Sequence, residues 1–293
     1  MKKSIIWTSI AIVLAILAFI FITHFRENGF NQDTQSENNP SQNYPPSEIQ
    51  QPNNQQANNE NCKVQFTEYL VDPKYVQKVG QVGVVHGGGK SIVERSYISM
   101  KEEYSEQEIP IYAPTDMELI SGAHYKVQGS PENTLADYVL KFDAGCGVEV
   151  LLGHLKGVVD QIESKLTPLK TDSREDEIRP SIHFKAGEKI GSFTKQNKAG
   201  AVSGFDFVVR DSSVTNQFIN QERYSNNRAR NLIHGVCPYD YYTGDKKTTY
   251  YNLLGGAGGT IFEVKDCGTA SRDKAGTISG MWFLDKEIVG EIY

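Results

Sequence analysis

Residues 138–156 read YVLKFDAGCGVEVLLGHLK, and this stretch decides the fold. Two apolar runs, rich in Val, Leu and Phe, lie on either side of a Gly-Cys-Gly segment, and the second run ends at His154. Short runs of β-branched and aromatic residues bounded by glycine are typical of β-strands. The stretch therefore predicts two strands, with a lone histidine where the second one ends.

The same rhythm continues on both sides of this stretch. Short runs rich in β-branched and aromatic residues are separated by Gly, Pro, Asn and Asp, and they predict a mostly β fold, an antiparallel sheet or sandwich. One helix is expected inside it, because Val158, Val159, Ile162 and Leu166 recur at helical spacing before Pro168. The clearest strand predictions are Val82–Val85, Ser96–Met100, Ile109–Tyr112, Tyr138–Phe142, Val148–Leu152 and Gly204–Arg210.

The N-terminus predicts a membrane anchor. Residues 5–23 are almost continuously apolar and follow Lys2 and Lys3. About 20 apolar residues are enough to cross the hydrocarbon core. The lysines predict a cytoplasmic N-terminus, and the exit sequence lacks the small-residue pattern of a cleaved signal peptide. We expect residues 1–26 to form a cytoplasmic tip and a single transmembrane anchor, with the rest of the chain extracytoplasmic.

A polar linker is expected next. Residues 27–61 consist largely of Asn, Gln, Ser and Pro and have almost no aliphatic residues. Such a segment buries too little apolar surface to offset the conformational entropy of folding. It is predicted to be a disordered tether between the membrane and the folded part of the chain.

Four cysteines follow the linker, namely Cys62, Cys146, Cys237 and Cys267. An even count in an oxidising compartment predicts up to two disulfides, for which three connectivities exist. A bridge between Cys237 and Cys267 is one hypothesis, and a buried free thiol at Cys146 is an alternative. The spacings do not match a structural zinc site made of four cysteines.

The chain as a whole excludes one class of partner. It has 293 residues and a formal net charge of −6, and its Lys and Arg residues are scattered. Binding to nucleic acid depends on a concentrated basic surface. We therefore expect no nucleic-acid partner.

Four segments together resemble the lysostaphin/LytM-like zinc endopeptidases, whose domain has the duplicated hybrid motif. The resemblance covers about residues 82–211 and lies in the order and approximate spacing of the segments. They are Ile109–Ile120 (IPIYAPTDMELI), Leu152–Leu155 (LGHL), Ala186–Gly191 (AGEKIG) and Ser203–Val208 (SGFDFV). The resemblance implies a β fold of the duplicated hybrid motif type. The same fold occurs in domains that are not peptidases.

The resemblance also implies where a zinc site would lie. In the family the ligands are the His and Asp of a His-x-x-x-Asp motif and the second His of His-x-His, with a water in the open position. Here the upstream candidate is His86, and Lys90 stands where the Asp is expected. Gly204 and Asp206 occupy the His-x-His positions. His86 and Asp206 are therefore candidate metal ligands only if a metal is bound, and a third ligand is not evident.

His154 matches the histidine of the family's Tyr-x-His-Leu pattern, so it is the candidate catalytic residue. The alternative is a structural histidine, hydrogen-bonded at the end of a strand. We expect His86, His154 and Asp206 to converge in a ligand-binding cleft. No cofactor is expected as the leading interpretation, and zinc is the alternative.

The domain prediction places the lysostaphin-like β domain at residues 62–245 and a small β unit at residues 246–293. Strands are expected in the second part at Thr260–Val264, Gly276–Phe283 and Glu287–Tyr293. The aromatic run Cys237–Tyr242 (CPYDYY) is either a packing strip or a stacking surface for carbohydrate or peptide.

Three functional hypotheses remain open. The leading one is an anchored envelope protein whose degenerate, non-catalytic domain binds or scaffolds cell-wall glycan, peptide or another envelope protein. The alternative is an active zinc metallopeptidase of the cell envelope. The third is a structural surface protein without a small ligand.

Overall fold

The computed structural model describes residues 62–86, 91–126, 136–166, 180–195, 203–224, 230–255, 266–271 and 273–278. All of them belong to one unit of the chain, Asn59–Tyr293. The predicted membrane anchor and linker lie outside these residues. Within the described part of the chain, no helix is long and apolar enough to span a bilayer.

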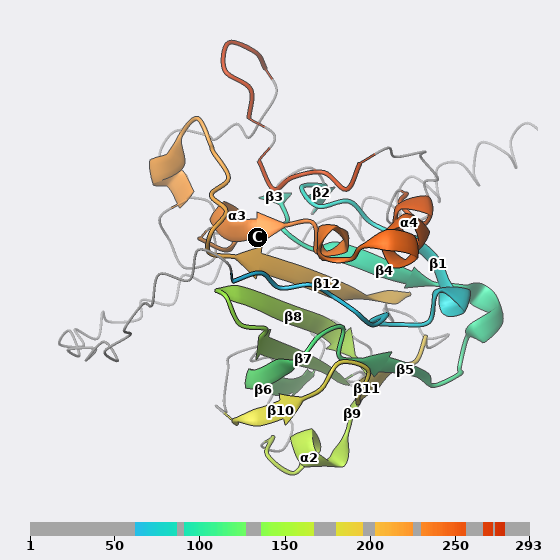
Figure 1. Ribbon diagram of the computed structural model, residues 1–293. Coiled ribbons are helices and arrows are strands. Elements are labelled where there is room, and N and C mark those ends of the chain that lie inside the picture. The colour runs from blue at the N-terminus through green and yellow to red at the C-terminus, as the bar shows by residue number, and fades with distance from the viewer. Residues whose placement is uncertain are drawn as a thin grey trace, which may run out of the picture. The chain divides into compact units, whose positions relative to one another are not determined.

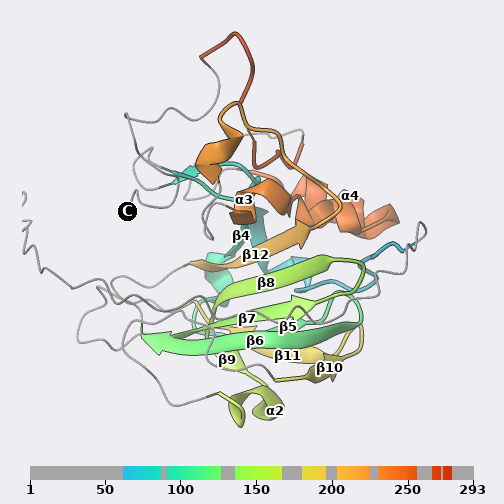
Figure 2. The same ribbon diagram turned by 90° about the vertical axis from the view of Figure 1, so that its left-hand side faces the viewer.

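Antiparallel strands form the larger sheet, which confirms the predicted mostly β class (Figure 1). The strand order is β1-β4-β12-β8-β7-β6-β10, and β13 also pairs with β12. Figure 2 shows β12, β8, β7 and β6 side by side at the centre of the sheet. The bounds are β1 Val76–Val79, β4 Ser96–Met100, β6 Met117–Lys126, β7 Ala136–Asp143, β8 Val148–Leu155, β10 Ile182–Phe184, β12 Gly204–Asp211 and β13 Gly235–Val236.

Two smaller sheets accompany it. The first has the order β5-β11-β9, and the second is the pair β2-β3. The predicted strands at residues 96–100 and 109–112 coincide with β4 and β5. The bounds are β2 Val85–His86, β3 Ser91–Ile92, β5 Ile109–Tyr112, β9 Gly157–Val158 and β11 Lys189–Phe193.

The predicted helix at residues 158–166 is too long. The α-helix of this region, α2, covers only Asp160–Glu163. Val158 lies in β9, where it pairs with Gly191, because a β-branched residue fits the extended backbone. Ile162 is fully buried, and Leu166 packs against the core. The helical spacing therefore predicted correctly that Ile162 and Leu166 contact the core, but it overestimated the length of the helix.

Helices of the described chain other than α2 are also short. The α-helices are α3, Arg230–His234, and α4, Gly244–Asn252. The 3-10 helices are η1 Pro73–Tyr75, η2 Glu102–Tyr104, η4 Gln221–Tyr224 and η5 Pro238–Tyr241.

Alternation along β12 separates an apolar face of the larger sheet from a polar one. Phe205, Phe207 and Val209 are fully buried in the hydrophobic core. Successive side chains of a strand point to opposite faces, so Asp206 lies on the other face. Leu152 faces the core from β8, and its backbone is paired with Phe207. The polar face is the one that carries the candidate site.

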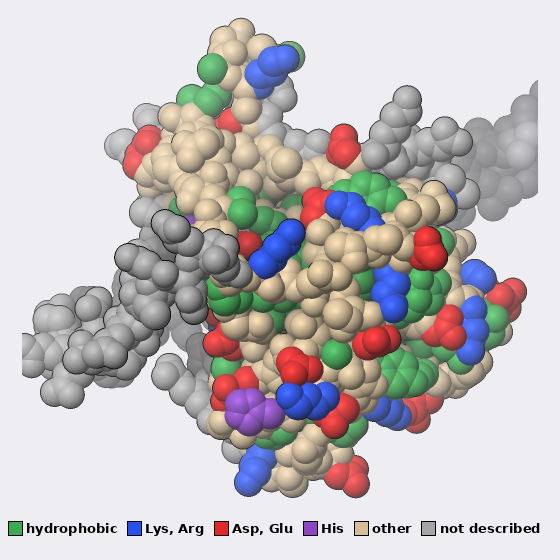
Figure 3. Space-filling model, viewed as in Figure 1, with side chains coloured by type: hydrophobic (Ala, Val, Ile, Leu, Met, Phe, Trp, Pro, Cys, Tyr) green, Lys and Arg blue, Asp and Glu red, His purple; other side chains and the backbone are tan. Residues whose placement is uncertain are grey.

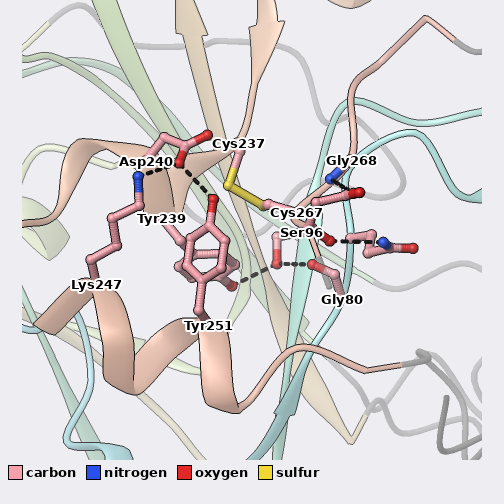
Figure 4. The surroundings of a disulfide bond; sticks show 11 residues. Gly80, Ser96, Cys237, Tyr239, Asp240, Lys247, Tyr251, Cys267 and Gly268 are labelled. Atoms are coloured by element: carbon pink, nitrogen blue, oxygen red, sulfur yellow. Dashed lines mark hydrogen bonds and ion pairs between the residues drawn. A yellow bond between two sulfur atoms is a disulfide. The ribbon is translucent and has the colours of Figure 1, made fainter. Parts of the chain in front are cut away.

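The chain around Cys237 completes the core with aromatic side chains. Tyr239, Tyr242 and Tyr250 are buried and pack against one another. The hydroxyl groups of Tyr239 and Ser96 are 2.6 Å apart, and Ser96 also donates to the carbonyl of Gly80 (Figure 4). The aromatic run at residues 237–242 is therefore a packing strip.

Both disulfides join segments that are distant in sequence. Cys62 is bonded to Cys146, and Cys237 is bonded to Cys267. The expected disulfides and the hypothesis for Cys237–Cys267 are confirmed, whereas the alternative of a free thiol at Cys146 is wrong. The Cys237–Cys267 bond lies beside the Tyr239–Ser96 contact in Figure 4.

The C-terminal part begins with a helix where a β unit was expected. Residues 246–252 belong to α4. This helix places Tyr250 in the aromatic core, and Tyr251 donates a hydrogen bond to Asp240 at 2.6 Å. Gly276–Ile278, expected to start a strand, form a turn and a bend. The predicted strands at residues 260–264 and 287–293 lie outside the described residues.

On the surface drawn in Figure 3, acidic and basic side chains are interspersed. The described side chains there do not form a continuous basic area.

Candidate functional site

His154 lies at the end of β8 in a backbone conformation that is uncommon for residues other than glycine. Its φ is 64°, and the β7–β8 register shifts beside it, between Tyr138 and Leu140. An extra residue in one strand of an antiparallel pair forms a bulge, and bulges redirect a side chain. The imidazole thus points toward charged groups on the polar face, with 14% of the side chain exposed.

Asp137 holds one edge of this imidazole. Its side chain is fully buried, and its Oδ2 lies 2.6 Å from His154 Nδ1. Because a carboxylate accepts hydrogen bonds, Nδ1 is the ring nitrogen that carries the proton in this contact. The other ring nitrogen, Nε2, faces away from Asp137. The ammonium group of Lys156, whose side chain is 6% exposed, donates to the second oxygen of Asp137.

Asp206 lies on the opposite side of the ring. Its Oδ2 is 3.7 Å from His154 Nε2, which is too long for a hydrogen bond. The same oxygen accepts a hydrogen bond from Arg95 Nη1 at 3.3 Å. Asp206 is buried, whereas 34% of the Arg95 side chain is exposed. We call Arg95, Asp137, His154, Lys156 and Asp206 the polar cluster.

The sheet brings the polar cluster together because β12, β8 and β7 are neighbours. Asp206 is paired directly with Gly153. A Cβ atom on Gly153 would lie 3.1 Å from Asp206 Oδ2, which is a tight contact. The missing side chain therefore makes room for the Asp206 carboxylate beside His154.

Tyr97 borders the cluster on β4, where it is paired with Asp206. Burial raises the pKa of its phenol to about 12, although a hydrogen bond with Ser203 opposes this shift, and the nearby Asp206 charge raises the pKa further. Tyr97 therefore stays protonated at neutral pH and supplies no charge to the cluster.

The structure brings together two of the three predicted site residues. His154 and Asp206 are neighbours on adjacent strands. His86 is the last residue of β2 and is paired with Ser91, but its side chain lies outside the described part of the structure. The convergence of His86 with His154 and Asp206 therefore stays a prediction.

Sequence reasoning missed Arg95, Asp137 and Lys156. A signal for two of them was present, because Asp137 and Lys156 stand at corresponding positions on either side of the Gly145–Gly147 turn. The hairpin pairs Phe142 with Val150 and Tyr138 with Leu155, so the next positions outward are Asp137 and Lys156. The sequence held no comparable signal for Arg95. This residue directly precedes β4, and only the strand order of the sheet brings β4 next to β12.

The residues that face one another here do not fit a zinc ion. Asp206 is already bonded to Arg95, and His154 Nδ1 is bonded to Asp137. The cluster includes two permanent cations, Arg95 and Lys156, which would repel a dication. Among the described residues, no group of three or more His, Cys, Asp or Glu is arranged to hold a metal.

The arrangement suits exchange of a proton or recognition of a polar group. A carboxylate that fixes one ring nitrogen of a histidine orients the other for hydrogen bonding or proton transfer. The two carboxylates of the cluster, Asp137 and Asp206, balance the two cations, Arg95 and Lys156.

Comparison with protein-family models and with curated proteins gives no match for this chain.

The buried Asp137 predicts a particular acid sensitivity. Burial raises the pKa of its carboxyl, but the hydrogen bonds from His154 and Lys156 outweigh burial and hold the pKa below its usual range. A lowered folded-state pKa stabilises the protein above the unfolded-state pKa of about 4, and this stabilisation is lost as the pH falls through the folded-state pKa. We expect the free energy of unfolding of the wild type to drop below about pH 4.

Urea unfolding between about pH 2 and pH 6 measures this effect. The Asp137→Asn variant lacks the titrating carboxyl, so its stability should change less steeply in the acid range, even if it is lower throughout. Equal slopes for the two proteins would contradict the role assigned to Asp137.

Proposed function

We propose that this protein is a membrane-anchored, extracytoplasmic protein whose degenerate lysostaphin-like domain binds cell-wall ligands without hydrolysing them. The observation that carries the proposal is the ion pairing of the predicted site residues. His154 and Asp206, which by resemblance would act on a zinc-bound water or hold zinc, are instead bonded to Asp137 and Arg95. A site built from balanced ion pairs suits binding of a polar ligand better than binding of a metal.

The arrangement of strands supports the duplicated hybrid motif as the finer fold assignment. The four segments of the resemblance fall on or beside strands that pair with one another. Residues 109–120 cover β5 and the start of β6, and residues 186–191 lead into β11, which pairs with β5. Residues 152–155 end β8, and residues 203–208 start β12, which pairs with β8. These pairings are the observation that supports the assignment.

Two further features support an extracytoplasmic location. Disulfides persist in oxidising compartments and are rare in the cytosol, and all four cysteines are paired. The apolar run at residues 5–23 and the polar segment at residues 27–61 supply an anchor and a tether of roughly 30 Å reach. A binding domain on such a tether would stay close to the envelope.

Co-sedimentation tests this proposal. The full chain, purified in a mild detergent, is mixed with isolated bacterial cell walls and centrifuged. We expect the protein in the pellet, release of bound protein by soluble wall fragments, and no new free amino groups in the wall. Protein that stays in the supernatant would contradict binding.

The same experiment separates the alternative of an active zinc peptidase. That alternative predicts new free amino groups, released by cleavage of the wall peptides, and one zinc per chain by elemental analysis. It also predicts that the His154→Asn variant no longer cleaves the wall peptides. Asparagine tolerates the positive φ at this position, so the variant tests the imidazole with little change to the backbone. Cleavage with these properties would replace the binding proposal.

A further inference from the structure

We propose that Arg95, beside His154, is the contact for a carboxylate group of the ligand. This inference rests on the proposed binding function and names the chemistry of the group that is bound. Arg95 is the most exposed charged residue of the polar cluster, with 34% of its side chain accessible. It directly precedes β4, Ser96–Met100.

The hydrogen bonding of Arg95 leaves room for a second acceptor. Among the described residues its hydrogen bond is the one from Nη1 to Asp206, at 3.3 Å. Charge-assisted bonds of this kind are usually about 2.7–2.9 Å long, so the contact is a loose one. A guanidinium has five N–H donors in a planar fork that matches a carboxylate. One acceptor at one nitrogen therefore does not satisfy the group.

The charges around Arg95 favour an anion over a cation. Lys156 is bonded to Asp137 inside the sheet, so the charge of Asp137 is already matched. Asp206 is buried between Arg95 and His154 Nε2, at 3.3 and 3.7 Å. An incoming carboxylate that binds the exposed edge of Arg95 would leave Asp206 next to His154. An incoming cation would meet two fixed positive charges.

A carboxylate can come from two sources in a cell wall, the end of a peptide or an acidic sugar. N-Acetyl-dialanine represents the first source and glucuronate the second. N-Acetyl-dialanine amide is the matched compound without the charge. Ligand-observed NMR titrations with the full chain in detergent measure the affinity for each compound.

We expect binding of at least one carboxylate and none of the amide. The Arg95→Met variant keeps the apolar stem but loses the donors, and we expect its affinity to fall about 10- to 100-fold. Lys74→Met is the control, because it removes a cation from an exposed pair with Asp72 outside the cluster. Its affinity should match the wild type. Binding of N-acetyl-dialanine alone would assign a peptide, and binding of glucuronate alone would assign an acidic sugar.

Equal binding of the amide, an unchanged affinity of Arg95→Met, or no binding of either carboxylate would overturn the inference. Its failure is distinct from failure of the proposed function. A wild type that co-sediments with walls but ignores carboxylates keeps the function and loses the contact. A wild type that binds carboxylates but stays in the supernatant does the opposite.

Discussion

The Lys156→Met variant is expected to lose about 3–5 kcal/mol of unfolding free energy, the cost of removing one partner from a buried ion pair. Lys156 bonds to Asp137, whose side chain is fully buried. Without the ammonium group, the Asp137 carboxylate keeps only the bond to His154 and stays out of water. Methionine retains much of the apolar stem, so the loss reports the charge more than the packing.

Urea denaturation of the full chain measures this loss, and two comparisons assign it. Lys189→Met removes a lysine from an exposed pair with Glu108 and should cost no more than about 1 kcal/mol. The double variant Asp137→Asn, Lys156→Met should be more stable than Lys156→Met alone, because an amide needs no counter-ion. If Lys156→Met and Lys189→Met lose equal stability, Asp137 is not the buried charge inferred here.

Removal of the Cys62–Cys146 disulfide should have a comparable effect. The bond joins residues separated by 84 positions. A loop of that length restricts the unfolded chain by about 4–5 kcal/mol in the chain-entropy model. Both cysteines are exposed, so the Cys62→Ser, Cys146→Ser variant disturbs little packing. Cys146 has a positive φ, and the exchange for serine adds no new backbone strain there because both residues have a Cβ atom.

The expected signature is a lower unfolding free energy together with a larger dependence on urea, because the unfolded state expands when the cross-link is removed. The matched variant lacks the second disulfide, whose cysteines are separated by 30 positions and are buried. The chain-entropy term is about 1 kcal/mol smaller for this loop, and any further loss reports packing around Cys237. A stability change under about 1 kcal/mol for the first variant would contradict the chain-entropy account.

Much of the strand pattern was accessible from the sequence. β4 and β5 have the predicted bounds, and β12 covers the predicted strand at residues 204–210, with Phe205 and Phe207 in the core. These elements were predictable because burial on one face of a strand leaves a period of two in the sequence. The helix at residues 158–166 was overestimated, since Val158 at its start pairs with Gly191 in a sheet. Helical spacing alone does not exclude that pairing.

The site was only partly accessible. The resemblance predicted that His154 and Asp206 would converge, and Asp206 Oδ2 lies 3.7 Å from His154 Nε2. Their partners did not follow, because Arg95 directly precedes β4 and Asp137 lies in β7, and both reach the site only through the order of the sheet. The conformation of His154, with φ at 64°, was also invisible, since a bulge depends on how two strands pair.

By itself, the sequence determined the mostly β class, which depends on the local composition and periodicity that each strand carries in its own residues. The candidate positions His154 and Asp206 came from the resemblance to the lysostaphin-like family. Tertiary structure decided which cysteines pair, that residues 244–252 form a helix, and that Asp206 faces Arg95. Each of these depends on residues far apart in the chain, and only the packed sheet brings them within reach of one another.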